Sequence, residues 1–165
     1  MDKSEGLDRL RILIADANPH MMSIVKLMLR GYGVRQYGEA ATCDAAWDEL
    51  DAGVYDLMIC ERMLGEQDTL SLVRRIRTDP DSGNPYLPIV MLSAYSEQVR
   101  IEEARDAGVT EFCRKPVTAR DLFAKIAISI DRPRRFVRAN TYFGPDRRRR
   151  DGDQYDGVDR RARVS

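Results

Sequence analysis

The sequence predicts an α/β protein, with a five-stranded, parallel, doubly wound sheet in residues 1–131 and an arginine-rich tail in residues 132–165. In the first part, five short apolar segments alternate strictly with five segments of helical periodicity, which is typical of a parallel sheet covered by helices on both faces. In the second part, proline, glycine and charged residues dominate, and no apolar period continues. Such a segment buries too little surface to fold alone, so we expect a tail that is disordered or ordered by a ligand.

Each predicted strand is a short apolar segment bounded by polar or turn residues. The strands are expected at Arg11–Ala15, Val34–Tyr37, Leu57–Cys60, Pro88–Leu92 and Glu111–Arg114. The helices are expected from Pro19 to Gly31, Ala40 to Leu50, Thr69 to Arg77, Ser96 to Ala107, and Thr118 to Ile130. Asn18 has the character of an N-cap, and Thr118 with Asp121 three residues later resembles a capping box.

Polar side chains mark the ends of four predicted strands. Asp16 and Glu61 end the first and third strands, and Ser93 and Lys115 end the fourth and fifth. Ligands and chemistry collect at the carboxyl ends of strands in open α/β sheets, so these groups could hold a cation and an anionic group. The alternative interpretation is a set of solvated residues that simply end the strands.

The segments ILIADANPH, YDLMICERMLGEQD, PIVMLSA and Arg114-Lys115-Pro116 resemble the CheY-like receiver domain of two-component response regulators, which has a flavodoxin-like fold. The resemblance covers nearly all of residues 1–131. In that family, two acids after the first strand and an aspartate ending the third bind Mg²⁺, and that aspartate accepts a phosphoryl group. A Ser or Thr and a Lys hold the phosphoryl group, and an aromatic residue near the fifth strand reports the switch.

This sequence departs from the family pattern at the acidic positions. Asp16 matches the first acid, but Ala17 stands at the second and Glu61 at the phosphoacceptor. Mg²⁺ needs near-octahedral oxygen ligation, and the extra methylene of Glu61 moves its oxygens by about 1.3–1.5 Å out of line for phosphoryl transfer. We therefore expect a pseudo-receiver that is not an enzyme and does not depend on Mg²⁺. Ser93 and Lys115 match the residues that hold the phosphoryl group, and a normally phosphorylated receiver is the disfavoured alternative.

Phe112 matches the position of the switch aromatic in the family. An aromatic residue near the fifth strand is also a common core residue, so both interpretations stay open. Phe112 lacks the hydroxyl group of tyrosine, so any switching would rest on packing alone.

The formal charge is divided between the two parts of the chain. Residues 1–131 carry 16 Lys and Arg against 22 Asp and Glu, a balance of −6, whereas residues 132–165 carry 11 Arg against 5 Asp, a balance of +6. This asymmetry indicates an anionic partner for the tail. A contact between the tail and the receiver, which holds the tail until a ligand competes for its arginines, is one hypothesis.

The tail contains a repeat with the pattern Y-x-G-x-D-R-R, at residues 142–148 and again at 155–161. Guanidinium groups bind phosphate bidentately and pair with guanine O6 and N7, and a carboxylate accepts from the other guanine edge. Two such sets suit a ligand with two guanines and two phosphates, and that composition is cyclic di-GMP. The candidate nucleotide-binding residues are Tyr142, Asp146, Arg147, Arg148, Arg149, Arg150, Asp151, Asp153, Tyr155, Asp159, Arg160 and Arg161.

The layout of a receiver with an arginine-rich extension resembles the CheY-like cyclic-di-GMP effector (Cle) proteins of flagellated α-proteobacteria. The resemblance implies a tail that binds the nucleotide and a receiver that contacts a protein partner such as the flagellar motor switch. The alternatives are a pseudo-receiver acting only by protein–protein contact and a nucleic-acid-binding regulator. Duplex nucleic acid is disfavoured because aspartates are interspersed with the arginines.

The remaining composition indicates a cytoplasmic protein. No apolar run approaches the roughly 18 residues of a membrane span, and the amino terminus has no apolar signal-peptide region. The three cysteines, Cys43, Cys60 and Cys113, include no CxxC pair, so we expect buried, reduced thiols rather than a metal site.

Overall fold

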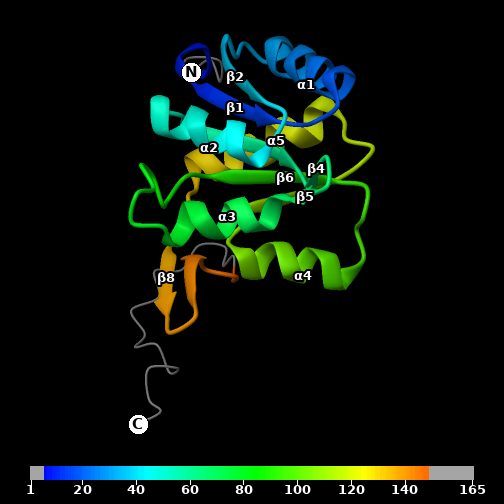
Figure 1. Ribbon diagram of the computed structural model, residues 1–165. Helices are drawn as coiled ribbons and strands as arrows, with labels where there is room; N and C mark the ends of the chain where they lie inside the picture. The colour runs from blue at the N-terminus through cyan, green and yellow to red at the C-terminus, as the bar shows by residue number, and fades with distance from the viewer. Residues whose placement is uncertain (1–5, 149–165) are drawn as a thin grey trace.

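The computed structural model describes residues 6–148, and its centre is a five-stranded parallel sheet with the strand order β2-β1-β3-β6-β7 (Figure 1). The sheet strands are β1 (Arg11–Ala15), β2 (Gln36–Ala40), β3 (Leu57–Glu61), β6 (Ile89–Ser93) and β7 (Glu111–Arg114). The α-helices are α1 (Pro19–Gly31), α2 (Cys43–Ala52), α3 (Thr69–Thr78), α4 (Gln98–Ala107) and α5 (Ala119–Asp131). The predicted α/β fold class is confirmed.

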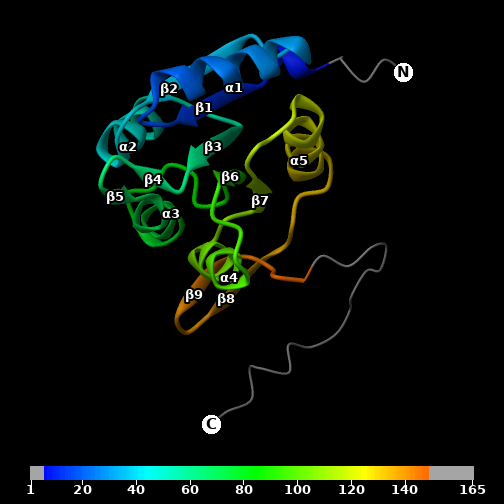
Figure 2. The same cartoon turned by 90° about the vertical axis from the view of Figure 1, so that its right-hand side faces the viewer.

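The sheet separates two apolar clusters, because successive side chains of a strand point to opposite faces. Ile12 and Ile14 of β1 belong to the cluster under α1 and α5, whereas Leu13 belongs to the cluster under α2, α3 and α4. Figure 2 shows the two groups of helices on the two sides of the sheet. The three cysteines are free and buried, as expected.

Two of the predicted helix starts agree with the structure, and each is marked by the capping side chain that the sequence indicated. Asn18 accepts from the His20 amide at 2.9 Å, and Thr118 accepts from the Asp121 amide at 3.0 Å. The second strand and second helix begin two to three residues later than predicted, at Gln36 and Cys43. The cap of α2 is the Thr42 side chain, which accepts from the Ala45 amide at 3.0 Å.

Two small hairpins and one short turn of helix were not predicted. The turn is η1 (Leu7–Arg9), and the first hairpin, β4 (Met63–Leu64) with β5 (Gln67–Asp68), lies between β3 and α3. The second hairpin, β8 (Phe136–Ala139) with β9 (Tyr142–Pro145), lies in the tail and packs below α3 and α4 in Figure 1.

The expectation of a disordered tail does not hold for residues 136–145. Phe143 in β9 is only 9% exposed. Its ring lies 5.4 Å from Tyr86 and 5.5 Å from Phe136, measured between ring centroids. This part of the tail is ordered because its aromatic side chains, which cannot form a core by themselves, pack against the receiver.

None of the helices among residues 6–148 is both long and apolar enough to cross a membrane.

Candidate functional site

The register of the parallel sheet brings the four predicted strand-end residues to one edge. Ala15 is opposite Cys60, so Asp16 and Glu61 follow on adjacent strands. Glu61 is opposite Leu92, one residue before Ser93, and the Lys115 amide donates to the Ser93 carbonyl at 2.9 Å. The structure therefore places these four residues at the carboxyl ends of neighbouring strands.

Glu61 is engaged through both of its carboxylate oxygens. Its Oε2 forms an ion pair with Lys115 Nζ, and its Oε1 accepts from the Arg62 amide at 2.9 Å. The Glu61 and Lys115 side chains are 18% and 19% exposed, so the pair is partly shielded from water. The carbonyl of Glu61 also accepts from the Thr69 hydroxyl at 2.7 Å, which fixes the backbone at this position.

The other strand-end residues have local partners. Asp16 is 8% exposed, and its Oδ1 accepts from the Asn18 amide at 2.8 Å. Ser93 is 1% exposed, and its Oγ accepts from the Tyr95 amide at 3.1 Å. Phe112 lies in β7, half-buried against the apolar cluster under α2, α3 and α4. Its role as a switch stays a prediction.

The donor set does not fit a Mg²⁺ site of the kind that the family resemblance implies. Ala17 supplies no side-chain oxygen, and both oxygens of Glu61 already have partners. Within residues 6–148, no group of three or more His, Cys, Asp and Glu side chains is arranged to hold a metal ion. Asp16 alone is a poor ligand set for a cation that demands near-octahedral oxygen coordination.

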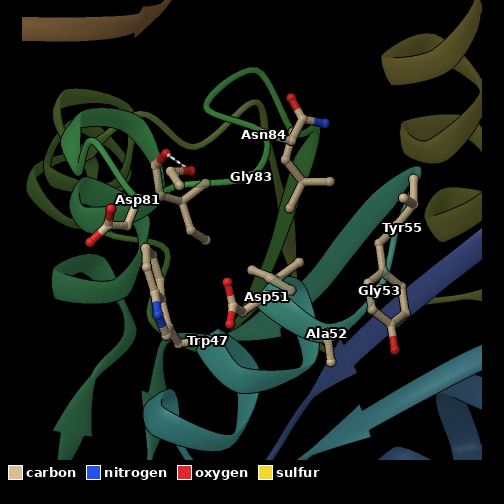
Figure 3. Close-up of a pocket in the computed structure, with 13 residues that line it drawn as sticks. Trp47, Asp51, Ala52, Gly53, Tyr55, Asp81, Gly83 and Asn84 are labelled. Atoms are coloured by element: carbon tan, nitrogen blue, oxygen red, sulfur yellow. Dashed lines mark hydrogen bonds between the residues drawn. The ribbon is translucent and has the colours of Figure 1, made fainter.

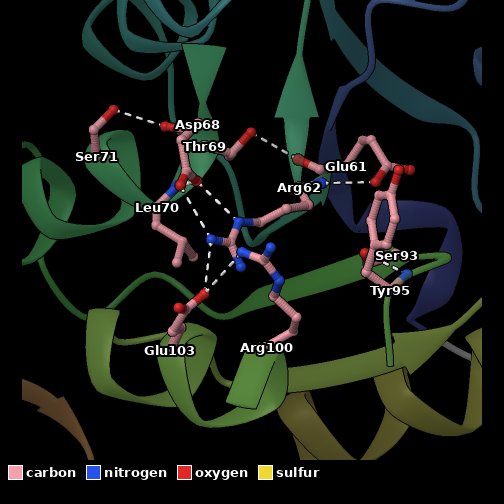
Figure 4. Close-up of polar contacts among 10 residues, drawn as sticks. All are labelled: Glu61, Arg62, Asp68, Thr69, Leu70, Ser71, Ser93, Tyr95, Arg100 and Glu103. Atoms are coloured by element: carbon pink, nitrogen blue, oxygen red, sulfur yellow. Dashed lines mark hydrogen bonds and ion pairs between the residues drawn. The ribbon is translucent and has the colours of Figure 1, made fainter. Parts of the chain in front are cut away.

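A second network begins at Arg62, directly after Glu61, and sequence reasoning missed it (Figure 4). The 8%-exposed Arg62 makes a bidentate contact with Asp68, with Nε–Oδ1 at 3.0 Å and Nη2–Oδ2 at 3.1 Å. Its Nη2 also lies 3.1 Å from Oε2 of Glu103 on α4. Arg62 therefore joins the end of β3 to α4. Asp68 was detectable as an N-cap, since it immediately precedes the apolar positions of α3. Glu103 was not detectable as a partner of Arg62, because it lies 41 residues away in the sequence.

Arg62 also stabilises the charged forms of its partners. Burial raises the pKa of Asp68, but hydrogen bonds from Arg62 and the Leu70 amide outweigh this effect, so the pKa lies below its ordinary value. The hydrogen bond from Arg62 likewise lowers the pKa of Glu103. Both carboxylates are therefore ionised in the Arg62 network at neutral pH.

The first repeat, residues 142–148, forms a local structure on the receiver. The Tyr142 hydroxyl donates to the Pro145 carbonyl at 2.7 Å, and Asp146 Oδ1 accepts from the Arg148 amide at 3.0 Å. The Arg147 guanidinium lies 5.0 Å from the centre of the Tyr142 ring and 3.0 Å from Asp106 of α4. Part of the repeated pattern thus has a structural role, which the sequence alone did not reveal.

Gly144 allows the hairpin to approach the receiver closely. A Cβ at this position would lie 2.6 Å from the Tyr142 hydroxyl oxygen and 3.3 Å from the Cα of Gly108. Gly108 itself has a φ of 112°, in the left-handed region that glycine adopts without strain. A side chain at the glycine of the repeat would therefore displace the Tyr142 hydroxyl and crowd the turn after α4.

The remaining candidate nucleotide-binding residues lie outside the described residues. These are Arg149, Arg150, Asp151, Asp153, Tyr155, Asp159, Arg160 and Arg161. Their assignment stays a prediction from the sequence.

Arg77 is a buried residue that supports the hairpin and that the sequence did not single out. Its Nε and Nη2 donate to the Gly108 carbonyl at 3.0 and 2.8 Å, and its Nη1 donates to the Pro85 carbonyl at 2.9 Å. The guanidinium lies 5.0 Å from the centre of the Phe136 ring. Burial lowers the pKa of Arg77 to about 9, so the group is still charged at pH 7.

A cavity of about 280 Å³ lies away from the strand-end residues, between the end of α2 and the loop before β6 (Figure 3). Trp47, Leu50, Tyr55 and Leu87 contribute apolar walls, and Asp51 and Asp81 also line it. These residues precede β3 and β6, so the cavity is at the amino ends of the strands. It is not part of the site around Glu61.

Comparison with known proteins identifies the same fold in two ways. The response regulator receiver domain family matches residues 12–127. The chain is 32% identical to chemotaxis protein CheY of Pseudomonas aeruginosa over 117 residues, covering 71% of this chain and 93% of that protein. It is also 32% identical to CheY-3 of Vibrio cholerae over 117 residues, covering 71% and 88% of the two chains.

Solved structures agree with this result. A two-component response regulator from Clostridium difficile superposes with a TM-score of 0.67 at 26% identity, covering 74% of this chain and 97% of that one. A CheY-like receiver domain protein from Methanospirillum hungatei gives a TM-score of 0.65 at 23% identity, covering 74% and 94% of the two chains. The second similarity concerns the fold alone.

Proposed function

Because the chain belongs to the response regulator receiver family, we propose that this CheY-like signalling protein works without phosphoryl transfer and takes its input through its arginine-rich tail. The ion pair between Glu61 and Lys115 is the observation that carries the first half of this proposal. In the family resemblance, the lysine holds the phosphoryl group on an aspartate. Here Lys115 already pairs with the carboxylate of Glu61. Ala17 stands at the position of the second acid.

Phosphorylation by a small-molecule donor tests this half directly. We expect no acyl phosphate when the full-length protein is incubated with acetyl phosphate and Mg²⁺, as measured by intact mass. The double variant Ala17→Asp/Glu61→Asp restores both acids and serves as the positive control. A stoichiometric mass increase in the wild-type protein would contradict the proposal.

For the second half, we propose that the tail binds cyclic di-GMP. Arg147 is 44% exposed and already pairs with a carboxylate, that of Asp106. Its guanidinium can therefore bind an anion at this position. Arg148, Arg149 and Arg150 follow directly in the sequence, so four consecutive residues carry a guanidinium group. We assign recognition of the phosphates to the arginines, since the Asp146 carboxylate is an acceptor and already accepts from the Arg148 amide.

Isothermal titration of the full-length protein with cyclic di-GMP tests this assignment. We expect micromolar or tighter binding that falls more than tenfold in Arg148→Ala/Arg149→Ala, because each charge-assisted bond contributes roughly 1.5–3 kcal/mol. Arg35→Ala/Arg120→Ala removes the same charge from exposed receiver positions and is the matched control. Absence of binding, or equal losses in both variants, would argue against a nucleotide site in the tail.

The output that we propose is contact with a protein partner, such as a component of the flagellar motor switch. A pull-down with the immobilised full-length protein, with and without cyclic di-GMP, tests this step. If the amount of captured partner does not change with cyclic di-GMP or with the tail variants, a pseudo-receiver that acts only by protein–protein contact is favoured. Strongly salt-dependent binding to random duplex DNA would favour a nucleic-acid-binding regulator instead.

A further inference from the structure

Helix α4 contributes little apolar side-chain surface to the core. Its buried residues are two alanines, Ala104 and Ala107, whereas α3 buries six residues. Val99 is 62% exposed, and the N-cap residue Glu97 makes no capping hydrogen bond through its side chain. A helix with so little apolar burial depends on its polar contacts and is expected to open more readily than its neighbours.

Two of these polar contacts come from segments that lie far apart in the sequence. Glu103 is held by Arg62, which follows the strand-end Glu61. Asp106, three residues later on the same helix face, is held by Arg147 of the tail. The short stretch from Glu103 to Asp106 therefore contacts both Arg62, which follows Glu61, and the first repeat.

The position of Asp106 in the helix makes its carboxylate unfavourable unless Arg147 compensates its charge. It lies in the last turn of α4, where the negative end of the helix dipole disfavours a carboxylate. The guanidinium of Arg147 offsets this effect at 3.0 Å. Loss of Arg147 from this position therefore weakens the C-terminal end of α4.

The contact between Arg147 and Asp106 can break without removing the hairpin. Its two side chains are 44% and 55% exposed, and exposed ion pairs are weak. The hairpin itself is anchored by Phe143 and by the rings of Phe136 and Tyr86, which a soluble anion does not displace. A ligand phosphate thus competes with Asp106 for Arg147 while β8 and β9 stay docked.

We propose that the Arg147–Asp106 ion pair is the switch through which an anionic ligand on the tail acts on α4. Ligand phosphate replaces the Asp106 carboxylate on Arg147, and α4 then opens more often near its C-terminal end. The inference rests on the proposed nucleotide binding, since it names the regulation of the same tail site. The competition is reciprocal, because Asp106 and the ligand bind the same guanidinium. Removing the Asp106 charge therefore raises the ligand affinity by the same factor by which the ion pair lowers it.

Hydrogen exchange of the full-length protein tests the switch without any ligand. We expect Arg147→Ala to raise amide exchange in the C-terminal half of α4 about two- to fivefold, and the double variant Arg147→Ala/Asp106→Asn, which also removes the uncompensated carboxylate, to reverse this rise. Glu102→Gln removes the same charge one turn earlier, where the side chain accepts from Gln98, and is expected to leave this exchange unchanged. Equal exchange in the wild type and all three variants would overturn the inference.

Addition of cyclic di-GMP separates this inference from the proposed function. In the wild type we expect faster exchange in α4 on binding, and in Asp106→Asn an affinity about two- to fivefold tighter than in Glu102→Gln. Binding without either change would overturn the switch. No binding to any protein would overturn the proposed ligand, while the exchange of the variants without ligand still decides the role of the ion pair.

Discussion

The Glu61 side chain lies at the end of β3, where the family resemblance places the phosphoacceptor. Its carboxylate pairs with Lys115 and accepts from the Arg62 amide, so one residue satisfies two donors that would otherwise lack an anion. Removing one partner of a shielded pair leaves the other charge uncompensated, which costs more than the pair itself contributes.

This arrangement predicts the effect of changing Lys115. We expect Lys115→Met to lower the free energy of unfolding by about 1–2 kcal/mol, because Glu61 then keeps its charge in a partly buried site. Urea denaturation at pH 7 measures the change. Lys125→Met is the control, since Lys125 is 40% exposed and its partner Glu111 also pairs with Arg134. Equal losses of unfolding free energy in the two variants would show that the Glu61–Lys115 pair contributes no more to stability than the exposed Lys125 contact.

Among the secondary-structure elements, α4 and the β4–β5 hairpin are joined by charge rather than by apolar packing. Arg62 contacts Asp68 at the end of β5 and Glu103 on α4, and Arg100 lies 3.4 Å from Glu103. Apolar packing fixes α3, whose buried face includes Leu72, Val73 and Ile76. The position of α4 therefore responds to charge more than that of α3.

The Arg62 network predicts a loss of stability in acid. Folding lowers the pKa of Asp68 and Glu103 from ordinary values of 3.8 and 4.5, so the unfolded chain binds more protons between the folded and ordinary values. The resulting stabilisation is present above about pH 4.5 and is lost as the pH falls through the lower folded values. Arg74 and Arg100 act on the same two carboxylates, in addition to Arg62.

Denaturation of the wild type and Arg62→Leu between pH 3 and pH 7 measures this contribution. We expect the difference in unfolding free energy between the two proteins to shrink as the pH falls below about 4, because the wild type loses the ion pairs that the variant lacks. A difference that stays constant across this range would contradict the role assigned to Arg62.

In the molecule as a whole, the β8–β9 hairpin joins the tail to the receiver. Through Phe136, the hairpin packs against Arg77 and Tyr86 of the receiver. The receiver and tail have opposite charge balances, and the Arg147–Asp106 and Arg134–Glu111 pairs join them. An experiment that removes the whole tail therefore removes part of the folded structure as well as the arginines.

Two truncations separate these effects. We expect a chain ending at residue 131 to lose about 2–4 kcal/mol of unfolding free energy, from the burial of Phe143 and its aromatic contacts. A chain ending at residue 148 keeps the hairpin and is expected to match the full-length protein. Thermal denaturation of the three proteins decides the point, and equal stability of the chain ending at 131 would show that the hairpin adds nothing.

The sequence by itself determined the five strand–helix units, the capping residues Asn18 and Thr118, and the strand ends that carry Asp16, Glu61, Ser93 and Lys115. These features follow from local periodicity and from the rule that parallel strands share one carboxyl edge. Only the tertiary structure decided that Arg62 reaches Glu103, that Arg77 supports Phe136, and that Arg147 pairs with Asp106. Each of these contacts joins segments 40 or more residues apart, and no local pattern of charge or hydrophobicity encodes the partner. The order of residues 136–145 has the same origin, because their aromatic side chains become buried only against the folded receiver.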